Sequence, residues 1–141
     1  MGSGRGKSKG GRGGSSKLST ISSREDLDRA IKDASTNATE TNKKGHLILL
    51  KFTANWCSVC TKIAPFCEGL ASDPKIATTL DRNVLVYKVD VDASPDLTNF
   101  YGASALPLFV FLVDGKKVDT LIGAQQTALK KKLLKHASSK K

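Results

Sequence analysis

Two cysteines three residues apart are the part of this chain best suited to do chemistry. Cys57 and Cys60 enclose Ser58 and Val59, and this spacing lets two thiols close a reversible disulfide or supply half of a metal site. The thiolate is the reactive form of cysteine, and its pKa falls from about 8.5 to roughly 3.5–7.5 in settings such as a helix N-terminus. A redox-active disulfide between Cys57 and Cys60 is therefore the first hypothesis, provided that a helix begins at this pair.

The segments on either side of the cysteine pair predict such a helix N-terminus. Residues 46–53 are mostly apolar and branched, a pattern typical of a central strand that is buried on both faces. Residues 61–71 then place apolar side chains at helical spacing. The two thiols consequently lie in the first turn of the helix, where unpaired backbone N–H groups and the helix dipole stabilise an anion.

The remaining apolar patterns predict that strands and helices alternate. The expected strands are 18–21, 84–91, 108–113 and 117–122, and the expected helices are 22–34, 95–101 and 127–136. We expect Ser22 and Glu25 to form a capping box at the first helix, which ends in a polar loop over 35–44. A connector with a short helical turn is expected over 72–83, and a hairpin turn at Asp114-Gly115. This order predicts an α/β protein with a mixed sheet of about five strands, flanked by helices on both faces.

Charge divides the 141 residues into a neutral domain and basic ends. The net charge is +10, yet residues 1–17 carry five basic side chains and no acid, and residues 130–141 carry six basic side chains and no acid. Segment 1–17 has almost nothing apolar to bury, so we expect a disordered basic arm there. The rest is long enough for one domain with a core, which we place at 18–136, followed by a basic tail at 137–141.

Composition also limits the cellular compartments in which we expect the protein. No apolar run approaches the roughly 20 residues that span a bilayer, and the N-terminus lacks the apolar stretch of a secretory signal. We therefore expect no membrane span and a cytoplasmic location, with the nucleus left open by the basic ends. Three cysteines in such a chain do not indicate a structural disulfide framework, so the pair is more plausibly redox-active or metal-binding.

The chain resembles the thioredoxin family over residues 18–136. Residues 52–60 match the family segment Phe-x-Ala-x-Trp-Cys-x-x-Cys, and residues 89–92 match a strand end common in its eukaryotic members. Pro65 stands at the position of the family's helix-kinking proline, Pro107 at its cis-proline, and Gly123 at a glycine beside the substrate groove. The resemblance implies the thioredoxin fold.

The resemblance also implies an activity, that of a protein-disulfide reductase working by dithiol–disulfide exchange. Cys57 would attack a client disulfide, and the more buried Cys60 would resolve the mixed disulfide. The implied substrate-binding residues are Trp56, Ser58, Val59, Leu106, Pro107 and Gly123. Trp56 either forms the apolar lip of the groove or is an ordinary packing residue. The implied protein is a monomer without cofactor or metal, which acts on disulfide-containing clients and receives electrons from an NADPH-dependent thioredoxin reductase.

One departure from the family pattern concerns the proton and charge balance of the site. Lys51 stands six residues before Cys57, where the family has a buried aspartate thought to handle the Cys60 proton. A charged Lys51 favours the thiolates, whereas a desolvated neutral Lys51 accepts a proton. In a third interpretation the aliphatic part of the Lys51 side chain is buried and its amino group lies in solvent. The residues between the cysteines, Ser58 and Val59, also differ from the family's usual pair, so the reduction potential is not predicted.

Two alternatives to catalysis stay open. A metal site needs further ligands, and His46 and His136 are interpreted instead as ordinary surface or strand-edge residues. A thioredoxin-like binding module with little turnover, held to nucleic acid or acidic partners by its basic ends, is the second alternative. Cys67 lies two helical turns beyond Cys60, too far for a direct bridge, so we expect a small core residue or, less simply, a regulatory thiol.

Overall fold

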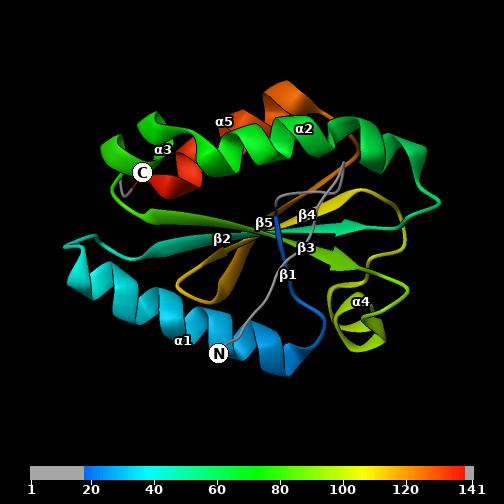
Figure 1. Cartoon of the computed structure of the whole chain (residues 1–141), viewed down its shortest axis with the longest axis horizontal. Helices are drawn as coiled ribbons and strands as arrows, with labels where there is room; N and C mark the ends of the chain where they lie inside the picture. Colours follow the sequence, from blue (N-terminus) through cyan, green and yellow to red (C-terminus); the bar gives the residue numbers. More distant parts are fainter. Residues whose placement is uncertain (1–17, 139–141) are drawn as a thin grey trace, which may run out of the picture.

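A single five-stranded sheet with helices on both of its faces organises the protein (Figure 1). The computed structural model describes residues 18–138, so the predicted arm at 1–17 and the last part of the predicted tail, 139–141, lie outside the described residues. In chain order the elements are β1 (Ser19–Thr20), α1 (Arg24–Glu40), β2 (His46–Thr53), α2 (Ser58–Ser72), α3 (Pro74–Thr79), β3 (Asn83–Asp90), α4 (Pro95–Tyr101), β4 (Leu108–Val113), β5 (Lys116–Ile122) and α5 (Gln126–Ala137). The predicted α/β class and mixed sheet are confirmed.

The strand order places the cysteine segment at the centre of the sheet. The order is β1-β3-β2-β4-β5, in which β1, β3 and β2 pair in parallel and β4 pairs antiparallel with both β2 and β5. β2 therefore has a partner on each side, which explains why its sequence is apolar almost throughout. Because α2 follows β2 after a short loop, its N-terminus lies at the carboxyl end of the most protected strand.

Each face of the sheet has its own apolar core. Leu47 and Leu49 of β2 pack toward α2, α3 and α5, and Ile48 and Leu50 pack toward α1 and α4. All four side chains are fully buried. Figure 1 shows the same division, with α2, α3 and α5 above the sheet and α1 and α4 below it. The alternation of side chains along β2 thus joins the two cores through one strand.

The first helix differs from its prediction at both ends. Ser23, not Ser22, is the N-cap, and its hydroxyl accepts a hydrogen bond from the backbone N–H of Asp26. The helix then continues to Glu40 instead of ending in a polar loop at residue 35. Ala38 is buried one turn beyond Ala34, so the extra turn of the helix also has a buried apolar residue. The polar residues around Ala38 make this hard to recognise in the sequence.

The other predicted boundaries lie within one or two residues of the observed ones. The short helical turn expected over 72–83 is α3, and the last helix ends at Ala137, which is buried. The hairpin turn at Asp114-Gly115 is confirmed, and both residues have the positive φ that this kind of turn requires, 51° and 86°. Within the part of the chain that the structure describes, no helix is long and apolar enough to span a bilayer.

Candidate active site

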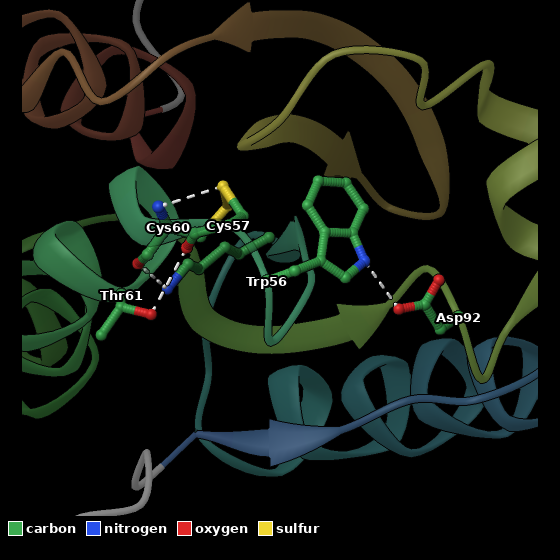
Figure 2. The surroundings of a disulfide bond; sticks show 6 residues. Trp56, Cys57, Cys60, Thr61 and Asp92 are labelled. Atoms are coloured by element: carbon green, nitrogen blue, oxygen red, sulfur yellow. Dashed lines mark hydrogen bonds between the residues drawn. A yellow bond between two sulfur atoms is a disulfide. The ribbon is translucent and has the colours of Figure 1, made fainter.

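Cys57 and Cys60 form a disulfide at the N-terminus of α2 (Figure 2). Cys57 is the N-cap residue, and its Sγ accepts a hydrogen bond of 3.3 Å from the backbone N–H of Cys60. The Cα atoms of the pair are 5.3 Å apart, a separation usual for disulfides. The backbone N–H that now contacts Cys57 Sγ is one of the unpaired donors of the first helical turn, and it would stabilise a thiolate in the same place.

The two sulfurs differ in access. The side chain of Cys57 is 9 % exposed, whereas that of Cys60 is fully buried. Both belong to a small apolar cluster with Ala54, against which the partly buried Val91 and Leu106 pack. An incoming group therefore reaches Cys57 first, while Cys60 is shielded from solvent within bonding reach of Cys57.

Trp56 is an exposed residue of the site. Its side chain is 69 % exposed, so the interpretation as an ordinary packing residue is wrong. The indole Nε1 donates a hydrogen bond of 2.9 Å to Oδ2 of Asp92, which follows β3 (Figure 2). This bond connects the loop before the cysteines to the loop after β3. It fixes the position of the exposed indole ring beside the disulfide.

The other predicted groove residues lie in two further loops and on the first turn of α2. The Leu106–Pro107 peptide bond is cis, as the resemblance implied. Pro107 is buried, and its carbonyl oxygen accepts a hydrogen bond of 2.8 Å from the backbone N–H of Gly123. Gly123 has a φ of 99°, a conformation in which a larger residue would be strained. Ser58 and Val59 are exposed on the first turn of α2. Of these residues, Leu106 packs against the cysteine cluster.

Lys51 is buried beneath the disulfide. Only 3 % of it is exposed, so the interpretation in which its stem reaches solvent is wrong. Its Nζ donates a hydrogen bond of 3.2 Å to the carbonyl oxygen of Cys60. Burial lowers the pKa of Lys51; the nearby Cys67 and Glu68 oppose this shift and Lys88 adds to it.

Cys67 is a free, fully buried thiol on α2 that packs in the core with Leu49 and Ile63. Burial raises its pKa to about 11, although the nearby Lys51 acts in the opposite direction. At neutral pH this thiol is therefore protonated and shielded. The expectation of a small core residue is confirmed by its burial.

The two histidines take separate structural roles. The prediction of a surface or strand-edge position is wrong for His46, which is buried at the start of β2 with its Nε2 3.2 Å from Ser35 Oγ. Ser35 lies in the part of α1 that continues beyond its predicted end. His136 is half-buried on α5, and its Nε2 lies 2.9 Å from Oδ2 of Asp119. Among residues 18–138, no group of three or more His, Cys, Asp or Glu side chains is placed to hold a metal ion.

A separate groove of about 370 Å³ lies between α2 and α5. It is lined by apolar Phe66 and Leu134 together with Gln126, Thr127 and two lysines of α5. Neither cysteine lines it. The chemistry of the site thus belongs to the exposed edge at the N-terminus of α2 and not to this cavity.

Sequence reasoning missed Asp92 as a partner of Trp56, although it noted the strand end at 89–92. β2 and β3 are parallel and in register from His46 with Asn83 to Thr53 with Asp90, so the loops that follow them meet at one sheet edge. The available signal was Asp92, which directly follows the predicted strand 84–91. Only the register shows that Asp92 reaches the indole.

Comparison with known proteins identifies relatives over most of the domain. Residues 29–135 match the family model described as Thioredoxin. Thioredoxin H4 from Arabidopsis thaliana is 38 % identical over 99 residues, which are 70 % of this chain and 76 % of that protein. The TPR repeat-containing thioredoxin TDX from the same plant is 37 % identical over 98 residues, but the matched part is only 24 % of its length. Its counterpart from Oryza sativa subsp. japonica is matched over 33 % of its length.

A solved structure supports the same relationship. The X-ray structure of Fasciola hepatica thioredoxin superposes with a TM-score of 0.69 at 35 % identity, and the match covers 84 % of this chain and 99 % of that one. The similarity therefore extends over most of the chain and almost all of the known structure.

Proposed function

The chain belongs to the thioredoxin family, and we propose that it reduces disulfide bonds of client proteins through Cys57 and Cys60. A thioredoxin domain with such a close cysteine pair is a dithiol–disulfide oxidoreductase; the reductive direction and the roles of the individual residues are what we propose. The observation that carries the proposal is the cysteine pair itself, with Cys57 at the helix N-terminus on the accessible side and Cys60 buried behind it.

The reaction begins with the reduced pair. The Cys57 thiolate attacks one sulfur of a client disulfide, a bond forms between the two sulfurs, and the other client sulfur leaves with the electron pair and takes up a proton. Cys60 then loses its proton and attacks Cys57 Sγ, which breaks the bond to the client and releases its second thiol. The chain ends as the Cys57–Cys60 disulfide, and the client has gained two electrons and two protons.

The surface around Cys57 would bind the client. Trp56, Ser58 and Val59 provide an exposed rim, and Leu106, whose backbone precedes the cis bond to Pro107, packs against the cysteine cluster. We propose that an extended client segment pairs with this backbone in the manner of an added strand, between Trp56 and Gly123. The exposed apolar side chains of Trp56 and Val59 favour a protein or peptide disulfide over a small-molecule disulfide.

The proposed electron source is an NADPH-dependent thioredoxin reductase, and the proposed state is a monomer in the cytoplasm, with the nucleus as a second location. A reducing compartment favours the reductive direction. The alternative of a nucleic-acid-binding module gains no support from the family match or from the relatives.

Insulin reduction tests the proposal. The full chain with dithiothreitol, or with NADPH and a thioredoxin reductase, should accelerate precipitation of the reduced insulin chains. Cys57→Ser should lose this acceleration entirely, whereas Cys67→Ser should keep it. Equal rates with wild type and with no added protein would show that the chain lacks this turnover.

A further inference from the structure

Lys51 is a buried lysine whose amino group contacts the backbone of Cys60. It lies near the carboxyl end of the central strand, on the face that packs against α2. Its register partners are Lys88 on β3 and Phe109 on β4. Lysine is almost never fully buried without a partner, yet among residues 18–138 no carboxylate lies within salt-bridge distance of Lys51.

A hydrogen bond joins the Lys51 nitrogen to the backbone of the resolving cysteine. Nζ lies 3.2 Å from the carbonyl oxygen of Cys60. Only four covalent bonds separate that oxygen from Cys60 Sγ, so Nζ is within roughly 8 Å of the sulfur. At this range, in a site shielded from water, a positive charge favours the ionised form of a thiol.

The groups around Lys51 leave this charge available to the dithiol. On α2, Cys67 is protonated at neutral pH because burial raises its pKa to about 11, and Glu68 adds negative charge. On β3, Lys88 adds positive charge, and on β4 the facing residue is the apolar Phe109. Ionisation of Cys57 and Cys60 is therefore the reaction that most changes the charge around Lys51.

We propose that Lys51 is a positioning residue whose ammonium group stabilises the thiolates of the reduced Cys57–Cys60 pair and thereby assists ionisation of the buried Cys60. The inference rests on the proposed function and extends it. In the resolving step the Cys60 proton passes to solvent and the Cys60 sulfur attacks Cys57 Sγ. The client sulfur leaves with the electron pair and takes a proton from solvent. Lys51 keeps its own proton throughout, so it stabilises charge and transfers nothing.

The same contact shifts the redox equilibrium. The ammonium group stabilises the thiolates but has no anion to stabilise in the disulfide, so it favours the reduced form of the pair. Removing the charge should then favour the disulfide. A tenfold change in this equilibrium constant corresponds to about 30 mV in the midpoint potential.

The test compares Lys51→Met and Lys51→Gln with Lys62→Met in the full chain. Lys62 is an exposed lysine two residues after Cys60, so its variant loses the same charge without opening the buried site. Thiol pKa values are measured on the reduced proteins from thiolate absorbance and from the pH dependence of iodoacetamide alkylation. The midpoint potential is measured against glutathione buffers, and circular dichroism checks that each variant is folded.

Both Lys51 variants should raise the pKa of the more acidic thiol by about one unit, slow its alkylation at pH 7 several-fold, and shift the redox equilibrium about tenfold toward the disulfide. Lys62→Met should change each quantity by less than twofold. Two neutral replacements of different polarity guard against a folding defect in either one. An unchanged or lower thiol pKa in the folded Lys51 variants overturns the inference.

The outcome is separable from the proposed function. If wild type reduces insulin but the Lys51 variants keep its thiol pKa and potential, only the role of Lys51 is rejected. If wild type itself does not reduce insulin, the reductase proposal is rejected, whatever the variants show.

Discussion

The indole Nε1 of Trp56 donates a hydrogen bond of 2.9 Å to Oδ2 of Asp92, across the gap between the loops that follow β2 and β3. The bond connects residues 36 positions apart and fixes the orientation of a ring that is otherwise largely in solvent. Since this ring stands beside the disulfide, its orientation should influence how a client is held.

Removing the acceptor of that bond should weaken client binding more than the chemical step. For Asp92→Ala we expect the KM for a protein disulfide to rise roughly two- to fivefold, the effect of losing about one hydrogen bond, with kcat nearly constant. Asp92→Asn keeps an acceptor oxygen and is the matched control. Steady-state insulin reduction separates the two constants. A fall in kcat at constant KM would count against a binding role for the indole. Trp56 is the single tryptophan of the chain, so its fluorescence reports the change directly.

Removing the resolving thiol should trap the client. In Cys60→Ser the first attack by Cys57 still occurs, but the sulfur that breaks the mixed disulfide is gone, so a covalent complex should accumulate. Non-reducing electrophoresis with a disulfide-bonded client should show this adduct, and it should disappear on adding dithiothreitol. Cys57→Ser is the control and should form none. An equal yield of adduct in both variants would contradict the assignment of Cys57 as the attacking sulfur.

Cys67 should matter for stability and not for turnover. Its thiol is fully buried, and its pKa is raised to about 11, so in native protein it should resist iodoacetamide at pH 8 and react only after unfolding. Cys67→Ala should lower the free energy of unfolding by about 1 kcal/mol, and Cys67→Ser by more, because a hydroxyl replaces the sulfur in an apolar environment. Urea unfolding measures both. Loss of insulin reduction in folded Cys67→Ala would point instead to a part in the reaction.

The ion cluster of Asp119 should stabilise the fold above acidic pH. Burial would raise the pKa of Asp119, but hydrogen bonds from His136, Lys132 and the backbone N–H of Thr120 outweigh it and lower the pKa to about 2. A carboxyl whose pKa is lowered in the folded state adds stability that is complete above its ordinary value near 3.8 and is lost as the pH falls toward 2.

Asp119→Asn should therefore lower the free energy of unfolding at pH 7 by about 1 kcal/mol, after allowing for solvent screening of this partly exposed group. Below pH 2, where Asp119 is protonated in the folded state as well, the stability of the variant should approach that of wild type. Urea unfolding as a function of pH gives the curve, and Asp73→Asn, at the N-cap of α3, provides a control that keeps an acceptor oxygen. A constant difference from pH 2 to pH 7 would show that the pKa shift is not its cause.

Local patterns in the sequence were enough to predict most of the fold. The apolar segment 46–53 predicted a central strand, and the observed β2 has those bounds and a partner on each side. Asp114-Gly115 predicted the last hairpin turn because few residue pairs tolerate positive φ at two successive positions. The spacing of Cys57 and Cys60 predicted a disulfide at a helix N-terminus, since both features depend only on neighbouring residues.

The tertiary structure decided what depends on residues far apart in the chain. The helix α1 continues to Glu40, with Ala38 buried, because its apolar side packs on a sheet that the local pattern does not describe. Lys51 is buried because β3, β4 and α2 enclose its strand, and nothing in its immediate sequence distinguishes that position from one facing solvent. Asp92 meets Trp56 only through the register of two parallel strands. Sequence periodicity fixes which residues share an element, but long-range packing determines which side chains lose water and which partners they then acquire.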